Sequence, residues 1–342
     1  MLRRYLTLWL VLSSGLAFCW PDLMRWLGGE TAGIDPFVAS KGGIKGAIVL
    51  TMFCIGGLLP PDEVRQIARQ WTAVLFGTAV QFGVMPLLAW AGATLAGLEG
   101  DLRIGVMIVG AVPGAMASNV LTLAARGNVS YSVCLTTSAT LLSPLVVPLA
   151  LKLTGGTAIP NERLVSISIE LLWTVVLPVI AGFGLCRWSR PLAGLMSRWG
   201  ESAANLAILW IIAAVVGLQR GYLTEGGSSE VFMTITWTLL GINLLGYVAG
   251  YLAGAAFGLP EPMRRALTIE VGMQNCGVGT SLAMSVLSAG TVATIPTALY
   301  TFGCVLTGTL LAQWFARLGG GGVETGDRDD QPTGEASPDC PA

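Results

Sequence analysis

The chain has 342 residues, of which 53% are hydrophobic and only 11% are charged, and its mean hydropathy is +0.69. A soluble globular domain carries about a quarter charged residues, so this composition excludes an ordinary soluble domain and places the chain among membrane proteins. The sequence has no histidine and a net charge of −1, which excludes histidine-based catalysis and leaves no basic field for nucleic acid.

Ten apolar stretches, each about long enough to cross a bilayer, follow one another along the chain. They cover approximately residues 5–27, 43–60, 71–96, 104–126, 129–152, 163–187, 202–221, 231–257, 263–289 and 291–317. We therefore predict an all-α polytopic membrane protein with ten transmembrane helices. The first stretch also has features of a signal peptide, but its apolar run continues to Leu27 and is long enough to span a membrane.

The Lys and Arg residues are distributed unevenly between the two ends of these stretches. With the N-terminus in the cytoplasm, twelve of the 19 cations fall on the cytoplasmic side and seven on the other. Because cytoplasmic loops are enriched in Lys and Arg, we predict a multi-pass protein of the inner (plasma) membrane with both termini in the cytoplasm. Residues 319–342 are rich in Gly, Pro and acids and are predicted to form a disordered cytoplasmic tail.

The fourth and ninth stretches are both interrupted by small and polar residues. Pro113 and Gly114 interrupt the fourth, and Gly272 interrupts the ninth. Each is the fourth of a set of five stretches, and because five is an odd number the second set would run upside down relative to the first. This pattern predicts two inverted five-helix repeats, with two discontinuous helices that cross at the membrane midplane, as in secondary transporters.

One ionisable residue, Glu270, lies near the middle of the ninth stretch. A charge at that depth costs about 2.5 to 3.5 kcal/mol on insertion scales, so it needs a compensating partner. Arg264 and Arg265 are candidates for a structural partner, but they lie at the entrance of the stretch and are expected to extend to the interface. A carboxylate beside the free carbonyls of a broken helix suits a small hard cation such as Na+, although Glu270 alone could also carry a proton.

Further oxygen ligands are available near the first interruption. Ser118 and Asn119 follow it directly, and Ser132 and Thr136 are four residues apart in the fifth stretch, on one helical face. Each hydroxyl taken alone is more often bonded to a carbonyl of its own helix, but beside a helix break the set indicates a cation site. Gln81, an isolated amide in the third stretch, either bonds a neighbouring helix or adds a ligand.

A broken helix also presents the N-terminus of its second half, where unpaired N–H groups and the positive end of the helix dipole favour an anion. Two such half-helices are expected to begin near 115–117 and 275–277. Cation ligands on one side and anion donors on the other predict coupled transport of an organic anion. The chain has no histidine or paired carboxylates for a membrane-embedded enzyme, and no soluble output domain for a sensor.

At these residues the sequence resembles the bile acid:sodium symporter family. The motifs are PGAMASNVLT at 113–122, GNVSYSVCLTTSATLLSPL at 127–145 and IEVGMQNCGVGTSLA at 269–283, with weaker support from MFCIGGLLPPDEVRQIARQW at 52–71. The resemblance implies alternating-access symport of Na+ with a bile acid, a sulfated steroid or a small carboxylate such as pantoate or pyruvate. It implies a transporter domain over 1–318, with a panel domain (about 5–60 and 163–221) and a core domain (about 71–152 and 231–317) that contains the crossed helices.

The resemblance also implies two Na+ sites that share one carboxylate. The first is Ser118, Asn119, Ser132, Thr136 and Glu270, and the second is Gln81, Glu270, Val271, Met273 and Gln274, where Val271 and Met273 contribute backbone carbonyls. The substrate is expected at Asn275, with Met116, Ala117 and Cys276 beside it, and no obligate protein partner is evident. Many family members have a small polar residue where this chain has Met116, so the choice of substrate stays open.

Overall fold

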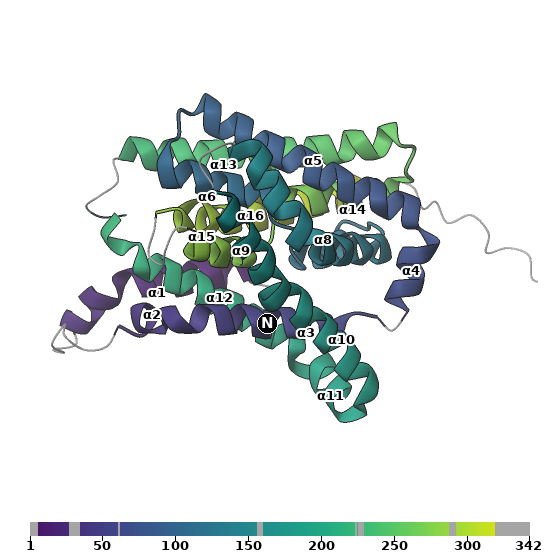
Figure 1. The fold of residues 1–342 in the computed structure, drawn as a ribbon, viewed down its shortest axis with the longest axis horizontal. Helices are drawn as coiled ribbons and strands as arrows, with labels where there is room; N and C mark the ends of the chain where they lie inside the picture. The colour runs from purple at the N-terminus through teal and green to yellow at the C-terminus, as the bar shows by residue number, and fades with distance from the viewer. Residues whose placement is uncertain are drawn as a thin grey trace, which may run out of the picture.

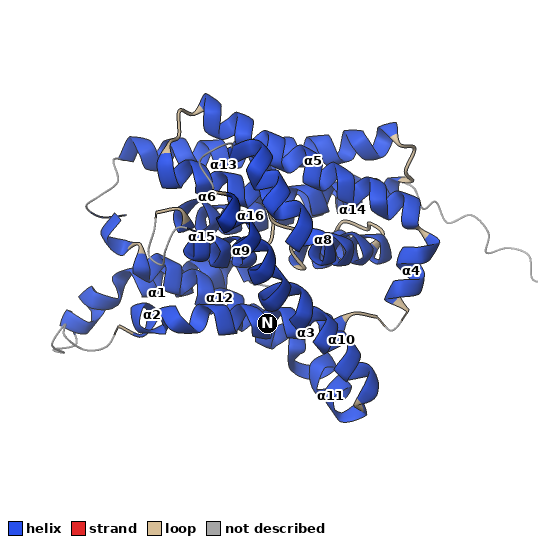
Figure 2. Cartoon of the chain, viewed as in Figure 1, coloured by secondary structure: helices blue, strands red, loops and turns tan. Residues whose placement is uncertain are grey.

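The computed structural model describes residues 6–26, 35–60, 62–155, 160–222, 224, 229–286 and 292–318. In this described part every regular element is a helix, as predicted (Figure 2). A single isolated β-bridge among the described residues joins Gly114 to Gln274. The predicted tail at 319–342 lies outside the described residues.

The helices follow the apolar stretches of the sequence closely. The longer elements are α1 (Leu6–Trp26), α2 and α3 (Pro36–Ala39 and Ile44–Leu58, joined by the 3-10 helix η2, Ser40–Gly43), α5 (Trp71–Leu95), α8 (Val129–Gly155), α9 and α10 (Asn161–Leu171 and Leu177–Trp188, joined by the π-helix η4, Leu172–Val176), α11 and α12 (Arg190–Leu195 and Glu201–Leu218, joined by the π-helix η5, Met196–Gly200), α13 (Ser229–Ala256) and α16 (Thr294–Leu318). The shorter helices are α4 (Glu63–Arg69), α6 (Gly100–Ala111), α7 (Ala117–Ala124), α14 (Glu261–Gly272) and α15 (Cys276–Val286).

Within the described ranges, seven helical stretches are long and apolar enough to cross a membrane. They are Pro36–Leu58, Trp71–Leu95, Val129–Gly155, Asn161–Trp188, Arg190–Leu218, Ser229–Ala256 and Thr294–Leu318. Large apolar side chains such as Leu87 and Trp237 are more than half exposed on these helices. Such surfaces fit a lipid environment, in which helices satisfy their own backbone hydrogen bonds, and the chain is a multi-pass membrane protein.

Both predicted interruptions are present, but for different physical reasons. After α6, Val112 is extended (φ −71°, ψ 156°) because the proline ring of Pro113 disfavours helical geometry in the preceding residue. After α14, Met273 is extended (φ −107°, ψ 102°). Gly272 is the last residue of α14, and a Cβ atom there would lie 2.2 Å from the ring of Tyr247. This glycine is therefore required for close packing of α14 on α13.

The helices form two groups that pack side by side. Figure 1 shows α1, α2, α3, α10, α11 and α12 together along the lower part of the view, and α5, α6, α13 and α14 along the upper part. In the lower group α3 packs on α10 and α12, and α1 packs on α12. The upper group also includes α7, α8, α15 and α16, because α13 packs on α5, α14 and α16, α5 packs on α8, and α16 packs on α7 and α15. The apolar core that includes residues of α3, α6, α9, α12 and α15 joins the groups, and Lys45 of α3 pairs with Glu170 of α9 at 3.1 Å.

A guanidinium group ties α1, α2 and the end of α12 together. Pro21 inside α1 has no N–H, so it cannot bond the carbonyl of Ala17 one turn earlier. Arg220 donates Nη2–H to that carbonyl and Nη1–H to Oδ2 of Asp35 at 3.0 Å. Asp35 also accepts the backbone N–H of Phe37 at 2.9 Å, which caps α2.

Candidate functional site

The carboxylate of Glu270 is fully buried and lies where three helices meet. Ser118 of α7 donates its hydroxyl to Oε2 at 2.5 Å, and Ser132 of α8 donates to the same oxygen at 3.4 Å. Thr136, one turn further along α8, donates to Oε1 at 2.7 Å. Neutral hydroxyls stabilise a carboxylate but do not cancel its charge, so these four residues form an electrostatically incomplete cluster.

The two arginines of α14 do not compensate Glu270. Arg265 pairs with Glu261 at 3.0 Å and Arg264 approaches the same carboxylate at 4.0 Å. Arg265 also stacks over the ring of Phe315, 5.3 Å from its centroid. Among the ion pairs of the described residues, none includes Glu270. The interpretation of Glu270 as one half of a structural ion pair is therefore wrong.

Several buried amide oxygens near Glu270 lack a hydrogen-bond partner in the described structure. They are Oε1 of Gln81, Oδ1 of Asn119 and Oε1 of Gln274, and both polar side-chain atoms of Gln81 are unpaired. A Cβ atom on Gly114 would lie 2.1 Å from Oε1 of Glu270 and 3.2 Å from Nε2 of Gln81, so both side chains crowd the same glycine. Buried unpaired oxygens cost free energy unless a ligand satisfies them, and hard oxygen donors of this kind suit a small cation.

The two helix breaks are hydrogen-bonded to each other through their backbones. Ala115 donates its N–H to the carbonyl of Met273 at 3.0 Å, and Asn275 donates its N–H to the carbonyl of Pro113 at 2.8 Å. These bonds make a short antiparallel pair between segments that are 160 residues apart in sequence. Predicted half-helix starts near 115–117 and 275–277 agree with α7, which begins at Ala117, and α15, which begins at Cys276.

The carbonyls released by the second break are satisfied by side chains. The carbonyl of Val271 accepts Nε2–H of Gln274 at 2.9 Å. The carbonyl of Gly272 accepts Nδ2–H of Asn243 at 2.8 Å and the hydroxyl of Tyr300 at 2.9 Å. Each carbonyl oxygen has two lone pairs, so those of Val271 and Met273 keep one for a ligand.

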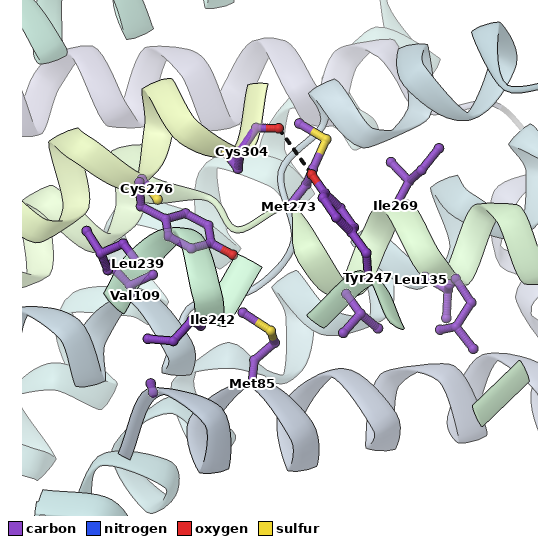
Figure 3. Packing of buried hydrophobic residues seen from close by; sticks show 14 of the residues in the cluster. Met85, Val109, Leu135, Leu239, Ile242, Tyr247, Ile269, Met273, Cys276 and Cys304 are labelled. Atoms are coloured by element: carbon purple, nitrogen blue, oxygen red, sulfur yellow. Dashed lines mark hydrogen bonds between the residues drawn. The ribbon is translucent and has the colours of Figure 1, made fainter. Parts of the chain in front are cut away.

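The residues that hold this break from α13 and α16 are not evident in the sequence. Oδ1 of Asn243 accepts the hydroxyl of Thr307 at 2.6 Å, and the Tyr247 hydroxyl donates to the carbonyl of Cys304 at 3.2 Å (Figure 3). Asn243 could be noticed as an isolated amide in an apolar run, but the tyrosines and Thr307 are ordinary residues of membrane helices. Only the packing of α13 against α16 gives them this role.

A cavity of about 280 Å³ lies on the other side of the two breaks. Its wall includes the four predicted substrate residues, which are Met116, Ala117, Asn275 and Cys276. Asn119 and Gln274 also line it, so the cavity and the Glu270 cluster share a wall. No Lys or Arg is among the lining residues in the described part of the chain. Oδ1 of Asn275 accepts the N–H of Val278 at 3.3 Å, which caps the start of α15.

Side chains of the lower helix group close the cavity on the opposite side. They come from α1, α3 and α12, and include Leu10, Thr51, Ile55, Glu201, Asn205 and Ile208. Glu201 and Asn205 are polar residues four apart at the start of α12, and their place in the cavity wall is not indicated by the sequence. The cavity is thus bordered by both helix groups and is mainly apolar with a few polar groups, as binding sites for small organic molecules usually are.

A buried carboxylate with hydroxyl partners, beside a cavity and at paired helix breaks in a membrane protein, is typical of secondary transporters. Comparison with known families agrees: the model of the Sodium Bile acid symporter family matches residues 46–226. An uncharacterized sodium-dependent transporter of Bacillus subtilis, YocS, is 30% identical over 310 residues, which cover 91% of this chain and 90% of that protein. The chain belongs to the Sodium Bile acid symporter family.

Two eukaryotic relatives have more specific names. The ileal sodium/bile acid cotransporter of Homo sapiens is 29% identical over 73% of this chain and 72% of its own length. The probable sodium/metabolite cotransporter BASS1 of Arabidopsis thaliana chloroplasts is 30% identical over 69% of this chain, which spans 57% of that relative. All three relatives are named as sodium-dependent transporters or cotransporters, so the prediction of a transporter and not an enzyme is confirmed.

Proposed function

We propose that this protein is a sodium-coupled symporter that moves an organic anion across the plasma membrane by alternating access. The observation that carries the proposal is the Glu270 carboxylate, which is fully buried, accepts hydrogen bonds from three neutral hydroxyls among the described residues, and lies beside the two helix breaks that line a cavity. A carboxylate is tolerated at such depth when a cation neutralises it. Sodium is the cation named for the relatives of this chain.

The first proposed sodium site is the hydroxyl cluster around Glu270. Its ligands are Ser118, Asn119, Ser132, Thr136 and Glu270. The three hydroxyls are already directed at the carboxylate, and a hydroxyl can rotate its hydrogen away so that a lone pair meets a bound ion. The unpaired Oδ1 of Asn119 supplies a further oxygen.

The second proposed sodium site lies at the break after α14. Its ligands are Gln81, Glu270, Val271, Met273 and Gln274. The support is that Oε1 of Gln81 and Oε1 of Gln274 are buried without partners, and that the carbonyls of Val271 and Met273 each have one lone pair left. A bound cation would coordinate these oxygens together. It would thereby offset the free energy that buried oxygens without hydrogen-bond partners otherwise cost.

The anion is proposed to bind in the 280 Å³ cavity at Asn275, beside Met116, Ala117 and Cys276. The starts of α7 and α15 border the cavity, and the positive end of the dipole at a helix N-terminus favours negative charge. Because no Lys or Arg is among the described lining residues, the neighbouring sodium ions would supply most of the compensating charge. Bile acids, sulfated steroids and small carboxylates such as pantoate or pyruvate are the candidate substrates.

We infer that the fold has ten spans in two inverted repeats. Besides the seven long helical stretches, α1 and the interrupted pairs α6–α7 and α14–α15 would provide the other three. Equivalent packing in the two halves supports the symmetry. In the first half α5 packs on α6 and α8, and in the second half α13 packs in the same way on α14 and α16. Between the halves, α3 packs on α10, and the symmetry-related α12 packs on α1. The lower helix group is proposed as the panel and the upper group as the core, with both termini in the cytoplasm.

Transport would follow movement of the core against the panel, since the cavity is bordered by both groups. Two sodium ions with a monoanion carry one net positive charge inward, and each charge gains about 2.3 kcal/mol per 100 mV of membrane potential. Uptake would then respond to voltage as well as to the sodium gradient.

The test replaces Glu270 with Gln, which keeps the side-chain shape and removes the charge. Glu261→Gln on the same helix is the matched control, because Glu261 is partly exposed and bonds Arg264 and Arg265. Thermal stabilisation by NaCl relative to choline chloride is measured at fixed pH, with and without a panel of carboxylates and sulfated steroids. We expect stabilisation by Na+ in the wild type and Glu261→Gln and none in Glu270→Gln; equal stabilisation in Glu270→Gln overturns the sodium site.

A proton-coupled carrier that uses Glu270 as its proton site is the second candidate. The same site geometry supports this alternative, since a buried carboxylate such as Glu270 can bind either Na+ or a proton. Uptake into vesicles at fixed pH separates the two: replacing Na+ by K+ or choline abolishes uptake in a sodium symporter and leaves it unchanged in a proton carrier.

A further inference from the structure

A second cavity of about 290 Å³ is lined by residues of α1, α13 and α16. Most of its lining is apolar and includes Leu239, Leu240, Leu299 and Phe302. It is similar in volume to the first cavity and both touch Cys304, but it takes no part in the proposed transport path.

The second cavity is continuous with the lipid-facing surface of the protein. Two of its lining residues, Val11 of α1 and Leu306 of α16, are 54% and 52% exposed. Both lie on apolar helices of a membrane protein, where the surrounding medium is the hydrocarbon of the bilayer. The neighbours available to fill the cavity from this side are therefore lipid chains.

The hydrogen-bond donors among the described lining residues of the cavity are all engaged inside the protein. Nδ2 of Asn243 and the hydroxyl of Tyr300 donate to the carbonyl of Gly272, and Oδ1 of Asn243 accepts from Thr307. The hydroxyl of Thr236 donates to the carbonyl of Phe232 in its own helix at 2.8 Å. The cavity therefore offers a ligand no free N–H or O–H donor from the described lining residues, and an acyl chain, which needs none, fits it.

We propose that this cavity binds an acyl chain of a membrane phospholipid. The acyl chain packs against Leu239, Asn243 and Tyr300, which are at most 3% exposed in the protein alone. It keeps water away from the hydrogen bonds that hold the carbonyl of Gly272. Bonds of this kind are stronger in a dry environment. The lipid chain thereby stabilises the second helix break, and it does so whichever ion or substrate the protein carries.

The chain offers a matched pair of glycines for the test. Gly303 lines the second cavity, and a Cβ atom there would meet no atom within 4 Å, so Gly303→Leu adds a bulky apolar side chain at the cavity wall from a Cβ position that is free of clashes. Gly241 on α13 also has no atom within 4 Å of an added Cβ but does not line the cavity. Both substitutions replace a helical glycine with leucine and so change helix propensity equally.

The experiment uses purified full-length protein in phosphatidylcholine vesicles that contain a little phosphatidylcholine with a diazirine near the end of one chain. After irradiation, adducts are mapped by mass spectrometry. We expect labelling of the buried residues Leu239, Asn243 and Tyr300 in the wild type and in Gly241→Leu, and a several-fold loss of it in Gly303→Leu. Labelling of exposed Trp237 serves as the internal standard.

Two outcomes overturn the proposal: absence of adducts on the buried residues in the wild type, and undiminished labelling of them in Gly303→Leu. Melting in detergent gives a second readout, because a ligand that binds the native state raises its stability. Added phosphatidylcholine should raise the melting temperature of the wild type and Gly241→Leu more than that of Gly303→Leu. An equal rise in all three contradicts a chain bound in this cavity.

Discussion

Asn275 donates its backbone N–H to the carbonyl of Pro113 at 2.8 Å, so the segment that interrupts one broken helix is held by the segment that interrupts the other. The return bond from Ala115 to Met273 makes this a two-bond antiparallel pair. Neither break can shift alone without losing a buried backbone hydrogen bond, which costs about 1–3 kcal/mol. The pair therefore behaves as one rigid unit, with the Glu270 cluster on one side and the cavity on the other.

Gly114 is where this unit touches Glu270, and its lack of a side chain is a steric requirement. A methyl group there would lie 2.1 Å from Oε1 of Glu270. We predict that Gly114→Ala displaces the carboxylate and abolishes stabilisation by Na+ in a thermal melt. Gly83→Ala in α5 is the control, since an added Cβ there meets no atom within 4 Å. Sodium stabilisation in Gly114→Ala that matches this control would contradict the assignment.

A substitution at Thr136 tests whether the hydroxyl groups around Glu270 contribute to sodium binding. Thr136→Val keeps the shape of the side chain and removes the oxygen that lies 2.7 Å from Oε1 of Glu270. Loss of one oxygen ligand should weaken sodium binding by about tenfold, or ~1.4 kcal/mol. The measurement is a sodium titration of thermal stability. Thr140→Val, one turn further along the same face of α8, is expected to behave as the wild type because its hydroxyl does not bond Glu270.

The positions of the helices and of both breaks could be predicted from the sequence because they depend on local composition. Pro113 removes a helical N–H and is followed at once by Gly114, a combination that disfavours continuation of a helix, and a run of apolar residues needs no distant partner to be recognised. The same holds for Glu270, whose depth in an apolar stretch is evident from its neighbours. A glycine at 272 could be read as a breaker, but its close contact with Tyr247 depends on packing between helices.

Pairings between distant residues could not be predicted. The sequence alone left Arg264 and Arg265 available to Glu270, and only the fold directs them to Glu261. Tyr300 has no local feature that distinguishes it, yet its hydroxyl bonds the carbonyl of Gly272 at 2.9 Å. Such partners are set by how α13, α14 and α16 pack together, which periodicity within one helix does not specify.

Asn243 holds the second break from outside the proposed ion sites. In Asn243→Leu the carbonyl of Gly272 loses its 2.8 Å bond and the hydroxyl of Thr307 loses its acceptor. We expect a loss of about 1–3 kcal/mol in stability and sodium binding weakened by about 10–100-fold, as for outer-shell groups at metal sites. Thr238→Val on the same helix is the control, because the Thr238 hydroxyl bonds a carbonyl of its own helix. Unchanged sodium affinity in Asn243→Leu would limit Asn243 to a purely structural role.

Arg220 offers a test of the fold that is independent of transport. Its guanidinium satisfies the carbonyl of Ala17, which lacks a helical partner because Pro21 has no N–H. We predict that Arg220→Ala lowers the melting temperature, since it removes the donor to this carbonyl and the donor to Oδ2 of Asp35.

Pro21→Ala restores an N–H to α1, so it should remove part of the penalty of Arg220→Ala. A double-mutant cycle of thermal stabilities checks this, and neighbouring groups that share a partner typically show coupling of about 0.5–3 kcal/mol. The double variant should be more stable than the sum of the single effects predicts. Additive effects would mean that the carbonyl of Ala17 contributes nothing, and that Arg220 acts only through Asp35.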